Sequence, residues 1–191
     1  MADRMTPEAF FAWQNTQAEP YELVDGHPRP HAKAFTAVSR WHDHVTVNLL
    51  CALHGPLRGT GCRLTTGNVA LRTGPTTLRR PDVTVEIAPM IPDSYENRAP
   101  RLVAEVISPC TTTIDCFRKL AEYRRHPSLA YILLVETRFP GTVLYRREGE
   151  GWADESFEAL DAVIELPAIG ARLTLADVYA DMTFEPGRAA Q

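Results

Sequence analysis

The sequence has 191 residues, of which 45% are hydrophobic and 23% charged, and its formal net charge is −4. This composition is typical of a globular protein with a sizeable core, and the length suits one domain spanning residues 1–191. The acidic balance argues against a protein that coats nucleic acid by bulk attraction. No stretch approaches about 18 uninterrupted apolar residues, so no membrane-spanning helix is expected.

The cellular compartment can be inferred from two further features. The first residues lack the basic and apolar regions of a secretory signal, so none is expected. The four cysteines form no Cys-x-x-Cys pair and no zinc-site spacing, which favours reduced thiols. We therefore expect a cytoplasmic protein with no membrane partner.

The spacing of apolar residues predicts a series of helices and strands. In chain order these are a helix that begins at Thr6, a strand over 21–24 that ends in an Asp25-Gly26 turn, a helix over 36–54, strands over 61–71 and 82–87, a loop over 88–100, a strand over 101–107, a helix over 114–126, strands over 129–136 and 142–147, and a short strand and helix within 159–182. Thr6 is the expected N-cap and Pro7 the first helical residue. Trp41 is expected on the apolar face of the long helix, which Gly55-Pro56 should end.

The strands over 101–107 and 129–136 are almost continuously apolar and are separated by a helix. This order is typical of two parallel strands buried on both faces. The sequence therefore predicts an α/β domain.

Glu105 is the one acid inside the apolar strand over 101–107, and a buried carboxylate is costly unless a partner satisfies it. Asp82 begins another strand, and neighbouring strands lie about 4.8 Å apart. Two carboxylates on such strands can share one Mg²⁺ ion, which prefers oxygen ligands. Glu22 is a candidate third ligand.

The helix over 114–126 places Asp115, Lys119 and Glu122 on one narrow stripe. Phe117 and Ala121, together with Leu120, fall on the opposite side and are expected to pack on the sheet. Lys119 would then lie near the end of the strand that carries Glu105, where sites in open α/β sheets tend to form.

Each residue also has a purely structural interpretation. Asp115 and Lys119 have the spacing of a surface ion pair, and Glu105 could pair with a buried arginine. Asp82 could be a turn acid, and Glu22 a solvent-facing strand residue. Short basic runs such as Arg79-Arg80 are interpreted as solvated surface.

The motifs in order resemble one known family. They are Tyr21-Glu22-Leu23-Val24-Asp25-Gly26, a histidine-bearing helix, Arg80-Pro81-Asp82-Val83, Val103-Ala104-Glu105-Val106-Ile107, and Asp115-x-x-x-Lys119-x-x-x-Tyr123. Together they are similar to the Uma-type restriction endonucleases of the PD-(D/E)XK nuclease superfamily, over about residues 6–179. The resemblance implies a restriction-endonuclease-like fold, a mixed central β-sheet flanked by helices.

The resemblance also implies roles for the site residues. Asp82, Glu105 and Lys119 would be catalytic, with Asp82, Glu105 and Glu22 holding Mg²⁺ or Mn²⁺. The superfamily's usual lysine position is Ile107 here, and Lys119 matches a lysine displaced to the following helix. The supporting candidates are Asp115, Tyr123, and one of His42 and His44.

The implied activity is metal-dependent hydrolysis of phosphodiester bonds in nucleic acid, with DNA as the expected substrate. Lys119 would position water, neutralise a phosphate oxygen, or act as a base. Cutting both strands would favour a homodimer. The alternatives are a catalytically inactive nuclease-fold module that binds nucleic acid or regulates, and a nuclease that depends on a DNA-targeting partner, since the sequence contains no recognisable DNA-reading motif.

Overall fold

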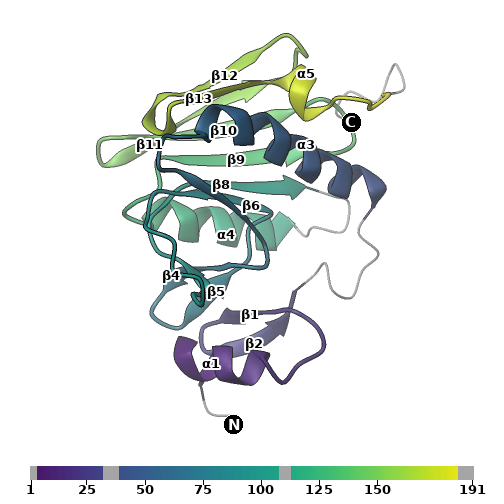
Figure 1. Ribbon diagram of the computed structural model, residues 1–191. Helices are drawn as coiled ribbons and strands as arrows, with labels where there is room; N and C mark the ends of the chain where they lie inside the picture. The colour runs from purple at the N-terminus through teal and green to yellow at the C-terminus, as the bar shows by residue number, and fades with distance from the viewer. Residues whose placement is uncertain (1–3, 32–38, 108–112, 185–191) are drawn as a thin grey trace.

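The computed structural model describes residues 4–31, 39–107 and 113–184. A six-stranded sheet in the order β11-β10-β9-β8-β6-β3 forms its centre, with α3 (Arg40–Leu57) on one face and α4 (Thr113–Arg125) on the other (Figure 1). The strands are β3 (Arg63–Thr66), β6 (Val83–Glu86), β8 (Pro100–Ile107), β9 (Tyr131–Glu136), β10 (Thr142–Glu148) and β11 (Gly151–Phe157). Strands β8 and β9 are parallel and the other pairs are antiparallel, which confirms the predicted strand–helix–strand unit and the mixed α/β class.

A second sheet has five strands in the order β2-β1-β5-β4-β7. They are β1 (Tyr21–Val24), β2 (His27–Pro30), β4 (Ala70–Gly74), β5 (Thr77–Arg79) and β7 (Glu96–Asn97), and α1 (Pro7–Gln14) packs on this sheet. The Thr6 hydroxyl caps α1 by accepting from the Ala9 amide, as predicted. Asp25 and Gly26 both have positive φ angles, 51° and 81°, which is the geometry of a tight hairpin turn between β1 and β2.

An apolar cluster lies on each face of the six-stranded sheet. Val45, Leu49 and Leu53 of α3 pack on one face of the six-stranded sheet. The same face receives a C-terminal hairpin of β12 (Val163–Leu166) and β13 (Ala171–Thr174), the 3₁₀ turn Pro167–Ile169, and α5 (Leu175–Val178). On the other face, Leu120 and Tyr123 of α4 cluster with strand residues that include Leu71 of the five-stranded sheet. Helix α4 therefore joins the two sheets.

The chain crosses from one sheet to the other between β5 and β6, through Arg80, Pro81 and Asp82. Arg80 fixes this crossing by donating hydrogen bonds to three backbone carbonyls, those of Tyr21, Gly67 and Asn68. Arg79 and Arg80 are both buried, so the interpretation of this basic run as solvated surface is wrong.

Several predicted boundaries also need correction. Helix α3 continues through Pro56 to Leu57, and its last turn closes when the Arg58 amide donates to Gly55. Residues 36–38 of the predicted helix lie outside the described residues. Trp41 is 44% exposed rather than on the packed face. The predicted strand over 61–71 is two strands, β3 and β4, in different sheets, and the predicted loop over 88–100 contains β7.

The described helices are all too short or too polar to span a bilayer.

Candidate active site at the junction of the two sheets

Asp82 and Glu105 face each other across the β6–β8 pair. Val83 is paired with Ala104 in this antiparallel ladder, so the same register places Asp82 opposite Glu105. Asp82 directly precedes β6 and has His42 of α3 as a partner, whereas the partners of Glu105 come from α4. The Val106 amide donates to Asp82 Oδ2 at 2.8 Å, which fixes the aspartate against β8. The structure thus brings the two predicted acids together.

Glu105 is buried among apolar strand neighbours, and α4 supplies its polar partners. The Tyr123 hydroxyl donates to Glu105 Oε1 at 2.6 Å, and Lys119 Nζ lies 3.5 Å from the same oxygen. Burial and the charge of Glu105 raise the pKa of Tyr123 well above its ordinary value, so this phenol remains a donor. These contacts account for an acid in an otherwise apolar strand.

The Lys119 ammonium is shared among three carboxylates. Besides Glu105, it lies 3.3 Å from Glu22 Oε1 and 3.8 Å from Asp115 Oδ2. Burial would lower the pKa of Lys119, but the charges of Glu105, Glu22 and Asp115 outweigh burial and raise it above its usual range. Lys119 is therefore a fixed positive charge at neutral pH.

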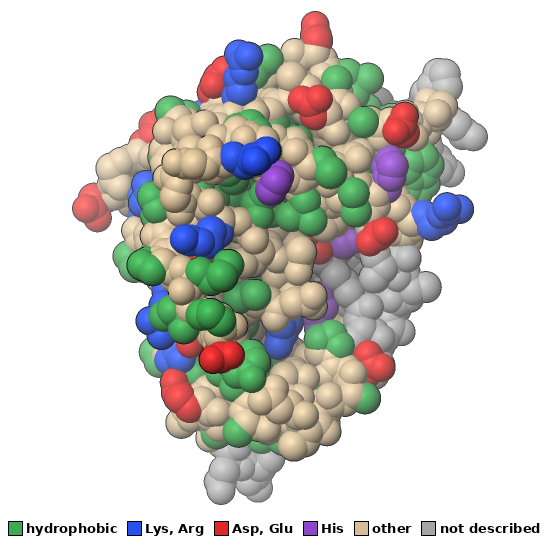
Figure 2. Space-filling model, in the orientation of Figure 1, with side chains coloured by type: hydrophobic (Ala, Val, Ile, Leu, Met, Phe, Trp, Pro, Cys, Tyr) green, Lys and Arg blue, Asp and Glu red, His purple; other side chains and the backbone are tan. Residues whose placement is uncertain are grey.

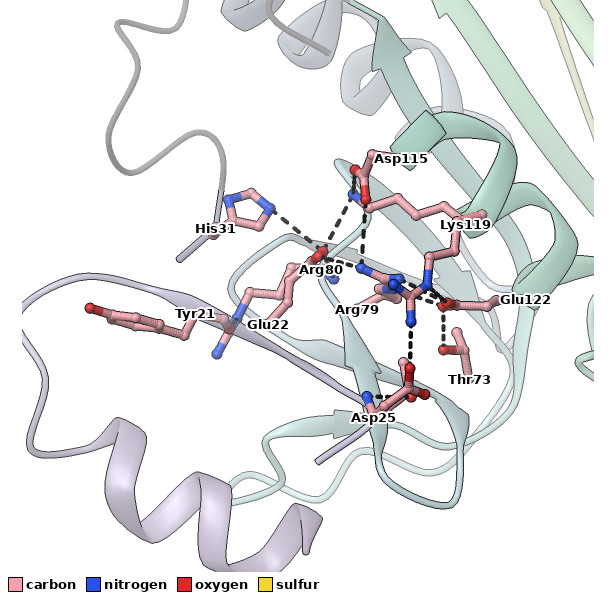
Figure 3. Close-up of polar contacts among 12 residues, drawn as sticks. Tyr21, Glu22, Asp25, His31, Thr73, Arg79, Arg80, Asp115, Lys119 and Glu122 are labelled. Atoms are coloured by element: carbon pink, nitrogen blue, oxygen red, sulfur yellow. Dashed lines mark hydrogen bonds and ion pairs between the residues drawn. The ribbon is translucent and has the colours of Figure 1, made fainter. Parts of the chain in front are cut away.

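Glu22 reaches this site from β1 of the five-stranded sheet, and nitrogen donors surround it. Arg79 donates to its Oε2 at 2.9 Å, while the Arg80 amide donates to its Oε1 at 3.0 Å (Figure 3). His31 Nε2 lies 4.0 Å from Oε1. Burial opposes ionisation of Glu22, yet Lys119 and Arg79 together lower its pKa to about 2.

The two candidate histidines occupy different places on α3. His42 is buried, and its Nε2 lies 3.3 Å from Asp82 Oδ1. His44 instead pairs with the Ala180 carbonyl, at 2.8 Å. The structure therefore associates His42, and not His44, with the acid pair.

Helix α4 presents a different face to the protein from the one expected. Phe117 is 68% exposed and Ala121 is exposed, whereas Lys119 and Glu122 are buried beside Leu120. The prediction that Phe117 and Ala121 pack on the sheet is wrong. Burial of the charged stripe is possible because acids and arginines from both sheets complete its ion pairs.

Two important residues were not among the sequence candidates. Arg79 is only 2% exposed and donates through Nε and NH2 to both carboxylate oxygens of Glu122, at 2.7 and 2.8 Å. The signal available in the sequence was the position of Arg79 three residues before Asp82, and of Glu122 on the stripe of Lys119.

The carboxylate oxygens at this site suit a hard divalent cation that binds only a few protein ligands. Asp82 and Glu105 offer buried carboxylate oxygens at neighbouring strands, and Mg²⁺ is usually bound by one or two carboxylates completed by water and phosphate oxygens. His42 Nε2 is buried near Asp82 and makes no hydrogen bond to a described residue. Within the described ranges, no group of three or more His, Cys, Asp or Glu side chains could hold a metal ion, so neither Glu22 nor His42 completes a three-residue ligand group with Asp82 and Glu105.

On the face drawn in Figure 2, acidic and basic side chains of the described residues are interspersed rather than separated by sign. This distribution agrees with the modest negative net charge.

Comparison with known proteins matches this chain to a family model, to a protein sequence and to solved structures. The family model described as "Uma2: Putative restriction endonuclease" matches residues 7–176. The uncharacterized protein slr1290 of Synechocystis sp. (strain ATCC 27184 / PCC 6803 / Kazusa) is 28% identical over 184 residues, which cover 95% of this chain and 94% of that protein.

Among the solved structures is a crystal structure described as a putative nuclease belonging to DUF820 from Anabaena variabilis ATCC 29413. It matches with a TM-score of 0.71 and 16% identity, over 92% of this chain and 98% of that one. At this identity the similarity shows the fold alone, and it confirms the predicted nuclease-like fold class.

Proposed function

The chain belongs to the Uma2 family, and from this premise we propose that it is a metal-dependent endonuclease that hydrolyses phosphodiester bonds in DNA. One observation carries the proposal. Glu105 is buried in a central strand with Lys119 Nζ 3.5 Å away, and Asp82 is held against the same strand by the Val106 amide. Two carboxylates and one cation in a partly buried site are the groups that phosphodiester hydrolysis needs.

Asp82 and Glu105 are the proposed holders of Mg²⁺ or Mn²⁺. A divalent ion bound there would supply an activated water and would offset negative charge in the transition state. Glu22 was predicted as a third metal ligand. Its neighbours are Arg79, Lys119 and the Arg80 amide, so its carboxylate is better placed to hold these side chains and this amide than to bind a metal ion.

The protein's own groups have distinct proposed roles. Lys119 would neutralise a non-bridging phosphate oxygen, hold the attacking water, or act as a base. Tyr123 would orient Glu105, and His42 would orient Asp82. Asp115 would help to hold Lys119.

The test is incubation of the purified protein with supercoiled plasmid and Mn²⁺, with and without chelator. Nicking or linearisation that chelator abolishes, and that Asp82→Asn lacks, is the expected result. Binding of DNA without cleavage would instead support the inactive nuclease-fold module. Parallel assays on single-stranded DNA and RNA test the choice of DNA, and sedimentation of the active protein tests the proposed homodimer.

A further inference from the structure

Arg79 lies at the centre of the charged contacts between the five-stranded sheet and α4 (Figure 3). Its NH1 group donates to Glu22 of β1, and its Nε and NH2 groups donate to Glu122 of α4. NH1 also lies 3.8 Å from Asp115 Oδ1. Arg79 itself belongs to β5, so one guanidinium connects two strands of the five-stranded sheet to the helix that carries Lys119.

The chemistry of these contacts requires arginine. A planar guanidinium can bind one carboxylate with two parallel N–H groups and a second carboxylate with another, whereas a lysine ammonium is a point charge without this fork. The Arg79 side chain is almost fully buried, so water cannot replace a lost partner.

Arg79 also determines how Glu22 is shared. It occupies Glu22 Oε2, while Lys119 lies near Oε1. Without the guanidinium, both oxygens of Glu22 would attract the ammonium and draw it away from Glu105. Glu122, held by Arg79, lies on the same stripe of α4 as Lys119, so the fork also sets the rotation of the helix.

We propose that Arg79 is a positioning residue of the active site, which holds Lys119 against Glu105 by fixing Glu22 and the inward face of α4. This inference rests on the proposed nuclease function and goes beyond it, because it assigns a role to a residue that acts only through others. A merely structural ion cluster would change stability when altered, but it would leave the rate of the chemical step unchanged.

The matched pair of variants is Arg79→Lys and Arg72→Lys. Arg72 lies in β4 of the same sheet and binds Glu96 with the same two-pronged geometry while also contacting Glu8. The rate of single-turnover cleavage of one DNA duplex is measured with Mn²⁺. The dissociation constant of the protein for the same duplex is measured with Ca²⁺. Both variants are also crystallised.

For Arg79→Lys we expect the single-turnover rate to fall about 100-fold with the dissociation constant nearly unchanged, since small displacements of a catalytic group have effects of this size. The distance from Lys119 Nζ to Glu105 Oε1, now 3.5 Å, should lengthen beyond the ion-pair limit of about 4 Å. Arg72→Lys should remain within about twofold of wild type. Equal rates in the two variants, or an unchanged distance in Arg79→Lys, would overturn the proposal.

If wild type cleaves no nucleic acid, the proposed function fails, and the distance in the variant crystal structure alone decides whether Arg79 positions Lys119. Glu122→Gln keeps the shape of the glutamate but weakens the same fork. If Arg79→Lys does not fold, Glu122→Gln takes its place in the cleavage assay and in the crystal structure. The expected and the contrary results are then the same as for Arg79→Lys.

Discussion

Lys119 Nζ lies 3.3 Å from Glu22 and 3.5 Å from Glu105, so one ammonium connects an acid of the five-stranded sheet to an acid of the six-stranded sheet. The lysine is buried, and both acids are buried with it. Its removal would leave two carboxylates to repel each other at the point where the sheets meet.

Lys119→Ala should therefore lower both activity and stability. Removal of one partner from a buried charge network costs on the order of 3–5 kcal/mol. Cleavage should fall at least about 100-fold, the usual cost of losing a preorganised charge. Urea unfolding and single-turnover cleavage measure the two effects. The control is Arg125→Ala, at an exposed site on the same helix, which should change neither stability nor cleavage. Cleavage at the wild-type rate by Lys119→Ala would contradict the role given to Lys119.

Glu105→Gln should separate a metal site from a structural acid. Lys119 keeps Glu22 and Asp115 as partners in this variant, so the expected loss of stability is only about 1–2 kcal/mol. Mn²⁺ should raise the melting temperature of wild type by mass action but not that of Glu105→Gln. Thermal melts of both proteins with and without Mn²⁺ provide the measurement. A wild type that shows no response to metal would argue against Asp82 and Glu105 as ligands.

Glu22 should make stability depend on pH in the acid range. Its pKa is about 2 in the folded protein against an ordinary 4.5, so its stabilising effect is complete above the ordinary value and is lost as pH falls toward 2. Glu22→Gln should thus be less stable than wild type near pH 6, by on the order of 3 kcal/mol, and the difference should shrink toward pH 2. Urea unfolding across this range tests the sign. Glu8→Gln, which alters an exposed ion pair, is the control, and a constant difference between wild type and Glu22→Gln would refute the assignment.

Tyr123→Phe should reduce cleavage because Glu105 loses a hydrogen bond of 2.6 Å. The expected decrease is about tenfold, with a loss of about 1–2 kcal/mol in stability. Tyr179→Phe is a matched control, since that hydroxyl also lies in a buried setting and bonds to the Gly141 and Glu136 carbonyls. The control should lose similar stability and keep its activity. If both variants cut equally well, Tyr123 does not support the site.

The sequence predicted β6, β8, β9 and β10 of the large sheet, because these strands contain apolar runs or alternations bounded by turns. It did not predict β11, whose residues are mostly polar and exposed, and it joined β3 to β4. It predicted the approach of Lys119 to Glu105 through a family resemblance and the geometry of a strand followed by a helix. It did not predict that Arg79 and Glu122 are buried, because local pattern treats charged residues as surface. Only the docking of two sheets shows that their charges compensate each other. The outward position of Phe117 was missed for the same reason.

The crossing at Arg80-Pro81 has a consequence for the order of assembly. Glu22 and Arg79 are on one side of it, and Glu105 and Asp82 are on the other. A folding intermediate with only one sheet formed would leave these groups hydrated and apart, without an ammonium between the acids. The proposed ability to cut would therefore exist only when the two layers are docked. A half-formed chain with this proposed activity would be harmless to the nucleic acid around it.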